Sequence, residues 1–271
     1  MLPRLKSFHK PKTINEALKL LARPGIRTLP LYGGPELFDN LAAAAEMEEV
    51  VSLAGLNLDR VSDEDGWLRL GAMTPLAALP DGDLATAAAR AYPLNLRQMW
   101  TVGAVVAHGG ASSPFLVTLL ALGARVEVAG QEEQDLSEYL PRRAATDLVA
   151  AVIVPSNPDC GGVAFEAVAR TPSDEPIVCA AACAKVDEGR IVAATLALGG
   201  VAKVPMLAND VARALLATPA TRESIEAALR TLDDPPLQPP ADFRGSSEYR
   251  RAMATVTARR ALLRAMGLSE N

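Results

Sequence analysis

Residues 31–38 form a glycine turn, with the sequence Leu31-Tyr32-Gly33-Gly34-Pro35-Glu36-Leu37-Phe38. The segment before it, 26–31, is strand-like, and Pro35 suits the first position of a helix that we expect over 36–47. Glycine lets backbone N–H groups approach an anion closely, and a following helix N-terminus adds favourable partial charge. No lysine accompanies the turn, and a proline has no N–H to offer a phosphate. Taken alone, the motif leaves open both a phosphate site and a plain strand–helix connection.

A second glycine turn follows at Thr101-Val102-Gly103-Ala104-Val105-Val106-Ala107-His108-Gly109-Gly110. It lacks the Lys-Ser/Thr pair of a P-loop and the glycine spacing of the dinucleotide fingerprint. The same two interpretations therefore stay open here.

The composition narrows the class of protein. The chain has 271 residues, of which 49% are hydrophobic, enough to bury one large core or two smaller ones. Its net charge of −5 argues against a nucleic-acid binder, which normally has a basic face. We find no apolar run that could span a bilayer and no secretory signal at the N-terminus, and we expect a cytoplasmic protein.

Cysteine and histidine are scarce. Three cysteines are too few for the four thiolates that an iron–sulfur cluster usually takes, and we expect Cys179 and Cys183 to be small buried hydrophobic residues. Two histidines exclude a histidine-rich metal centre. No residue stands out as catalytic, and no metal ligands are assigned.

The order of elements predicts two domains: the first begins with a β/α pattern, and the second is α+β. The capping box Thr13-Ile14-Asn15-Glu16 opens a first helix. The sequence Pro155–Gly162 is the best boundary, so we expect a first domain over 1–157, with subdomains at about 1–54 and 55–157, and a second over 158–271. After the boundary come three strand-like segments and then helices; the strands are expected at 163–170, 176–186 and 190–198, and the helices at 205–217, 221–232 and 247–266. The last helix carries Arg250, Arg251, Arg259, Arg260 and Arg264, which form either a docking face or a solvated face.

Along nearly its whole length the chain resembles a known family. The segments that carry the resemblance are Phe8–Leu21, the first glycine turn, Leu68–Thr74, Leu96–Gly103, Leu119–Ala124 and Arg244–Leu262. Together they resemble the flavin-binding medium subunit of the molybdenum hydroxylases, the family of xanthine dehydrogenase and carbon monoxide dehydrogenase.

The resemblance implies an FAD-binding domain of two α+β subdomains, followed by a smaller α+β domain with three antiparallel strands and then helices. It implies that FAD lies between the subdomains and that the two turns hold its pyrophosphate. The implied partners are a molybdopterin-binding large subunit and a 2Fe-2S small subunit, with NAD or another acceptor taking the electrons. The cofactor-binding residues implied are Leu31, Gly33, Gly34, Pro35, Glu36, Leu37, Thr74, Thr101, Val102, Gly103, Ala104 and Val105.

The departures from the family pattern fall on these motifs. Pro35 stands where the family has Thr, and Glu36 puts a longer carboxylate where it has Asp or Asn. Ala104 and Val105 replace Gly-Asn, and Pro114 takes the place of an acid. Two hypotheses follow: an oxidoreductase subunit that passes electrons through FAD, or a flavin-free, non-catalytic structural or assembly paralogue.

Overall fold

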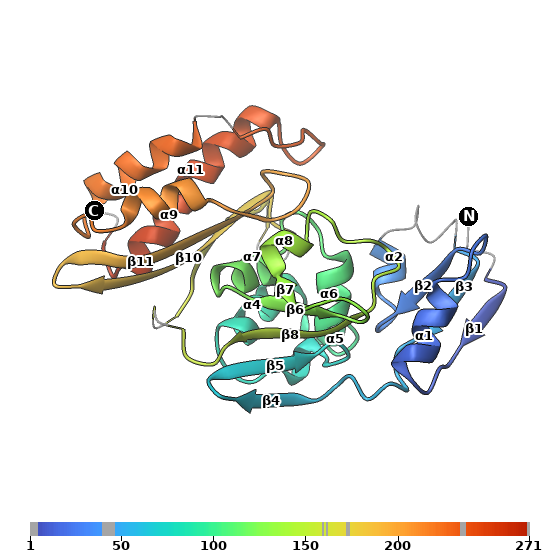
Figure 1. The fold of residues 1–271 in the computed structure, drawn as a ribbon. Helices are drawn as coiled ribbons and strands as arrows, with labels where there is room; N and C mark the ends of the chain where they lie inside the picture. The colour runs from blue at the N-terminus through green and yellow to red at the C-terminus, as the bar shows by residue number, and fades with distance from the viewer. Residues whose placement is uncertain are drawn as a thin grey trace. The chain divides into compact units, whose positions relative to one another are not determined.

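The computed structural model describes residues 5–39, 47–158, 160, 162–171, 174–233 and 237–269. The chain divides into two compact units, and Figure 1 shows the helices and strands of each. Unit 1 contains Met1–Pro80, Tyr92–Gly109 and Arg125–Val154, and unit 2 contains Asp81–Ala91, Gly110–Ala124 and Pro155–Asn271. Helices and antiparallel sheets occur in both, which confirms the α+β class. None of the helices in the described part of the chain is long and apolar enough to cross a membrane.

A small parallel sheet opens unit 1. Its strands are β1 (Ser7–His9), β2 (Thr28–Leu31) and β3 (Glu49–Ser52), in the order β1-β3-β2. Helix α1 (Ile14–Leu21) begins at the expected cap, where Thr13 Oγ1 accepts a hydrogen bond from Glu16 N at 3.2 Å. The edge position of β2 tolerates Pro30, which has no N–H to donate. The first glycine turn leads from β2 into α2 (Glu36–Asp39), and most of the helix expected over 36–47 lies outside the described residues.

A five-stranded sheet completes unit 1. Its order is β4-β5-β8-β6-β7, and the strands are β4 (Val61–Glu64), β5 (Trp67–Gly71), β6 (Arg125–Val128), β7 (Gln134–Asp135) and β8 (Val149–Pro155). The central strand β8 is apolar and buried from residue 149 to 154. The helical pieces between the strands are η1 (Leu76–Ala78), α5 (Leu94–Arg97), α6 (Val102–His108) and α8 (Leu136–Tyr139). The segment expected as the second glycine turn, 101–110, is therefore mostly helical, since α6 occupies residues 102–108 of it.

Unit 2 is built on an antiparallel sheet in the order β12-β11-β10-β9. Its strands are β9 (Ala164–Val168), β10 (Val178–Asp187), β11 (Arg190–Gly199) and β12 (Met206–Leu207). Strand β12 was not expected; it occupies the start of the helix predicted from residue 205. The helices of the unit are α4 (Asp83–Ala91), α7 (Pro114–Ala121), α9 (Asn209–Leu215), α10 (Arg222–Leu229), η2 (Arg230–Leu232) and α11 (Ser247–Ala265). Two of them, α4 and α7, precede the expected boundary at 157.

Successive side chains of β10 point alternately to the two faces of this sheet. Val178, Ala180 and Ala182 belong to a core shared with α9, α10 and α11, which run along the β10–β11 hairpin (Figure 1). Cys179 points to the other side, where its thiol approaches Ser112 O at 3.3 Å. It is a free, buried cysteine, as expected, and burial raises the pKa of its thiol.

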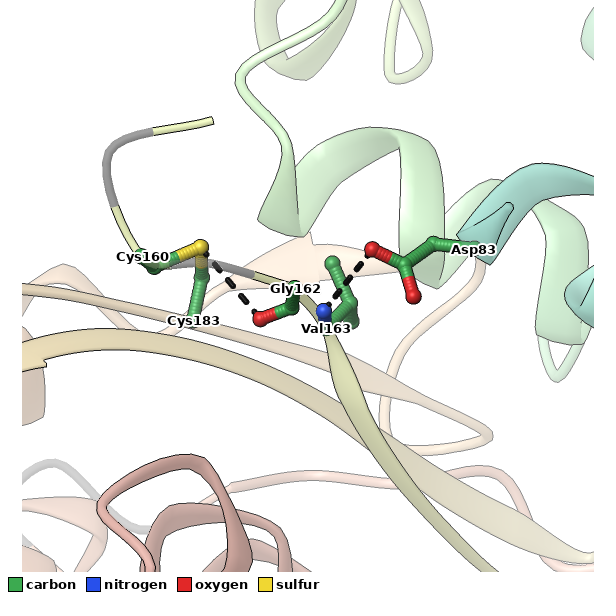
Figure 2. Close-up of a disulfide and its surroundings, with 5 residues drawn as sticks. All are labelled: Asp83, Cys160, Gly162, Val163 and Cys183. Atoms are coloured by element: carbon green, nitrogen blue, oxygen red, sulfur yellow. Dashed lines mark hydrogen bonds between the residues drawn. A yellow bond between two sulfur atoms is a disulfide. The ribbon is translucent and has the colours of Figure 1, made fainter. Parts of the chain in front are cut away.

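The expectation for Cys183 was incomplete, because Cys183 forms a disulfide with Cys160 (Figure 2). The Cα atoms of the pair are 5.5 Å apart. Strand β9 pairs with β10 so that Ala164 lies opposite Ala182, and this register brings the residues before β9 to Cys183. Asp83 holds the same approach to β9 by accepting a hydrogen bond from Val163 N at 2.9 Å. The strand pairing that brings the two cysteines together is not given by their spacing in the sequence.

Arg250 on α11 belongs neither to a docking face nor to a solvated face, the two alternatives considered for the arginines of this helix. It is 2% exposed and donates hydrogen bonds to Ile177 O at 2.5 Å and to Asp242 Oδ1 at 2.7 Å. Burial opposes ionisation of Asp242, but the bonds from Arg250 and from two backbone N–H groups outweigh it and lower its pKa to about 2. Arg250 is a buried residue that fixes α11 in unit 2.

Candidate functional site

The first glycine turn binds a carboxylate from its own chain. Oε1 of Glu36 accepts hydrogen bonds from Tyr32 N at 2.7 Å and Gly33 N at 3.1 Å. Oε2 of Glu36 accepts from Gly34 N at 2.8 Å. Gly34 has a φ of 110°, a conformation that side chains rarely allow and that helps to point successive N–H groups at one place. Three backbone donors thus converge on one anionic group.

This arrangement tests whether the turn fits a phosphate. Carboxylates and phosphates are both anionic acceptors for backbone N–H groups, and a run of such donors forms an anion-binding concavity. The carboxylate of Glu36 is therefore a stand-in for an anionic ligand, and its three short bonds show that the donor set fits one. The Glu36 side chain is 2% exposed and occupies this anion position itself.

The second turn uses its N–H groups within the fold. Val102 N donates to Thr74 O at 3.0 Å and Gly103 N donates to Ala72 O at 2.8 Å. Ala104 N donates to Thr101 Oγ1 at 3.2 Å, which makes Thr101 the N-cap of α6. Val105 N begins the helical ladder by donating to Thr101 O at 3.1 Å. These four donors are engaged, so the second turn does not present a matching set to a ligand.

The two turns lie against each other. A Cβ at Gly33 would overlap the carbonyl oxygen of Met99, just before the second turn, and would lie 3.5 Å from the Thr101 methyl group. A Cβ at Gly103 would come within 2.6 Å of Ala72 Cβ and 2.8 Å of the Tyr32 ring. The glycines at these two positions therefore serve close approach of the turns.

Tyr32 is a site residue that the sequence analysis did not select. Its ring covers Gly103, and its hydroxyl donates to Asp147 O at 3.0 Å and accepts from Val149 N at 2.8 Å. Burial raises the pKa of the hydroxyl well above its ordinary value, so it stays neutral. The signal available in sequence was a large aromatic residue directly before Gly-Gly, in a chain with 4% aromatic residues.

A further polar pair lies at the far end of α6. Arg143 donates to Val106 O at 2.9 Å and to Gly109 O at 2.8 Å, where the helix presents free carbonyls. His108 packs edge-on to Tyr32, with ring centroids 6.1 Å apart. Burial lowers the pKa of His108, and the positive charge of Arg143 lowers it further against the opposing effect of Glu36. His108 is therefore neutral at pH 7.

The structure brings the residues selected from sequence together in unit 1 but leaves few of them accessible. Gly33 is exposed, and Leu31, Gly34 and Leu37 are partly exposed. The others are buried: Pro35, Glu36, Thr74, Thr101, Val102, Gly103, Ala104 and Val105. Contact with a ligand is thus available chiefly at the glycines of the first turn.

Comparison with known proteins assigns a protein family to each of two parts of the chain. The family described as "FAD binding domain in molybdopterin dehydrogenase" matches residues 4–157, more than half of the chain. The chain belongs to this family. The family described as "CO dehydrogenase flavoprotein C-terminal domain" matches residues 163–265. Membership confirms the family resemblance and brings FAD with it as the implied cofactor.

Relatives extend over the whole length. The carbon monoxide dehydrogenase medium chain of Afipia carboxidovorans is 29% identical and covers 100% of both chains. The nicotine 6-hydroxylase medium subunit of Paenarthrobacter nicotinovorans is 27% identical and covers 97% of this chain and 98% of its own. Reconstituted CO dehydrogenase from Oligotropha carboxidovorans superposes with a TM-score of 0.87 at 27% identity, covering 99% of this chain and 100% of that chain. These relatives favour a flavoprotein medium subunit over a flavin-free paralogue.

Proposed function

We propose that this chain is the medium subunit of a molybdenum hydroxylase-type oxidoreductase. In that role it holds FAD and passes electrons from an iron–sulfur subunit to an acceptor. The observation that carries the proposal is the match of both family domains in order, over the full length of several medium subunits. Bound FAD would supply the redox chemistry, and the chain would supply binding and orientation.

The backbone donors of Tyr32, Gly33 and Gly34 are the groups we assign to the FAD pyrophosphate. Support comes from their present bonds to a carboxylate, which show that they can hold an anion. Thr101 and Gly103 would act at the second turn by placing α6 close to the first turn. The remaining residues selected from sequence would line the same region: Leu31, Pro35, Glu36, Leu37, Thr74, Val102, Ala104 and Val105.

The partners in the proposal are a molybdopterin-binding large subunit and a 2Fe-2S small subunit. Support comes from relatives that are themselves named medium chains or medium subunits. The three cysteines are too few for a cluster of four thiolates, and two of them form a disulfide, so the cluster belongs to another chain. NAD or another small acceptor would take the electrons from the flavin.

Purification of a tagged chain from the cells that make it naturally tests this function. We expect the chain to bring molybdenum, iron and FAD in fixed ratios, measured by elemental analysis and by the visible absorbance of released flavin. Addition of NAD and, separately, of ferricyanide to the reduced complex would identify the acceptor. A chain isolated without molybdenum, iron or flavin would contradict the proposal.

A cytoplasmic location is also part of the proposal. Disulfides are rare in reducing compartments, so the Cys160–Cys183 pair allows a direct test. Thiols would be alkylated in intact cells before lysis, and the labelled peptides would be read by mass spectrometry. A reduced, alkylated pair would support a cytoplasmic location, whereas the oxidised pair that the structure has would contradict it.

A further inference from the structure

The carboxylate of Glu36 occupies the donors that the proposed function assigns to the pyrophosphate of FAD. We propose that Glu36 is an intramolecular competitor of the pyrophosphate and that it sets the affinity of this chain for FAD. The inference rests on the proposed function only in naming FAD as the ligand. The competition itself follows from the contacts of the first turn.

The bonds to Glu36 and those to a phosphate are mutually exclusive. The N–H groups of Tyr32, Gly33 and Gly34 point at the two carboxylate oxygens over distances of 2.7 to 3.1 Å. Each N–H carries one hydrogen, and Pro35 adds no donor that could serve a second anion. Two anions within the same turn would also repel each other strongly in a buried place. A phosphate can therefore bind only after the carboxylate leaves.

The competitor is tethered and so has a high effective concentration. Glu36 is two residues from Gly34, and such a short link keeps its carboxylate near the donors. The apparent affinity for FAD is then the intrinsic affinity reduced by the fraction of molecules in which the turn is open. Because Glu36 is buried and makes three bonds, that fraction is small in the wild type.

Two substitutions at this position test the competition. Glu36→Ala removes the carboxylate, and Glu36→Gln removes its charge while keeping its size. FAD titrations followed by flavin fluorescence and by calorimetry should show tighter binding by about tenfold or more for Glu36→Ala. Glu36→Gln should give a smaller gain, since its amide oxygen can still accept from one or two donors.

The ligand series separates the pyrophosphate from the rest of FAD. Riboflavin has no phosphate, so its affinity should be the same for the wild type and for Glu36→Ala. Inorganic pyrophosphate should raise the melting temperature of Glu36→Ala and leave that of the wild type unchanged. The matched control is Glu132→Ala, which removes the same charge from an exposed position of unit 1 and should alter none of these values.

Either variant at position 36 can overturn the proposed competition. If Glu36→Ala or Glu36→Gln is folded by circular dichroism and binds FAD no more tightly than the wild type, the competition is overturned. If Glu36→Ala does not fold, Glu36→Gln alone decides. A gain in FAD affinity in a chain that carries no molybdenum or iron in its native cells would keep this inference and overturn the proposed function. Unchanged affinity in a chain isolated with all three would do the reverse.

Discussion

The first and second glycine turns lie together but hold their backbone donors in different ways. At the first turn the N–H groups of Tyr32, Gly33 and Gly34 are bonded to a side chain. At the second turn the N–H groups of Val102 and Gly103 are bonded to backbone carbonyls of Thr74 and Ala72. A side chain can rotate away or be substituted, whereas the backbone carbonyls belong to the fold. The first turn is therefore the one whose donors a ligand can take over.

The two turns also use glycine for different purposes. Gly34 adopts a positive φ and contributes a donor to the first turn. Gly103 has an engaged N–H, and its importance lies in the absence of a Cβ beneath the Tyr32 ring. Glycine thus positions a backbone donor in the first turn and allows a packing contact in the second.

The largest effect is expected for Gly33→Ala, which breaks the contact between the turns. The new Cβ would overlap Met99 O, a backbone atom that cannot move without shifting the second turn. We expect a loss near the upper end of the about 1–3 kcal/mol typical of overpacking, measured by urea unfolding of the full chain. At the control position Gly55 the nearest atom is Pro11 O at 3.2 Å, so Gly55→Ala should cost much less. Equal losses would mean that the turns are not held in contact at Gly33.

The next effect is expected for Tyr32→Phe, which keeps the ring over Gly103 and removes the hydroxyl. Val149 N, on the central strand β8, would lose its acceptor in a buried place. We expect a loss of about 1–3 kcal/mol in unfolding free energy and faster hydrogen exchange at the Val149 amide. Tyr249→Phe is the control, because Tyr249 is 41% exposed. Unchanged exchange at Val149 would contradict the role of the Tyr32 hydroxyl.

Much of the fold could be predicted from sequence patterns. The Thr13 cap and the long helix α11 follow from local chemistry, and the structure has both. The two-residue strand β12 was not predicted, because so short a strand has no period of its own. The Cys160–Cys183 pair depends on the register of β9 against β10, which is a tertiary property.

The contact between the two glycine turns was predictable from sequence, whereas the hydrogen bonding of the first turn was not. The two glycine turns were expected to face one cofactor, and the structure brings them into contact within unit 1. Glu36 was selected as a departure from the family pattern, but its reach back to three N–H groups depends on its side-chain conformation. Tyr32 was missed because the direction of its ring is decided by contacts with Gly103 and Val149, which are far away in sequence.

A smaller effect is expected for Thr101→Ala, which removes the side-chain cap of the second turn. Ala104 N would lose its acceptor, and such caps are worth about 1 kcal/mol. Thr101→Ser keeps the hydroxyl and should keep most of the stability. Inorganic pyrophosphate should restore the melting temperature of Glu36→Ala but not that of Thr101→Ala, because Ala104 N is buried. Rescue of both variants would mean that the turns are equivalent.

The smallest effect concerns pH and links the two turns through His108 and Glu36. Burial holds the pKa of His108 below its ordinary value of about 6.5, so the folded chain takes up this proton less readily than the unfolded chain. Stability is therefore full above about pH 6.5 and falls as the pH drops from there through the folded pKa.

Urea unfolding at pH 7.5 and 5.5 should show this loss in the wild type and a smaller loss in His108→Leu. Glu36→Ala removes the negative charge that opposes the shift, so its loss should be larger than that of the wild type. An equal loss in His108→Leu and the wild type would show that His108 does not report on the turns.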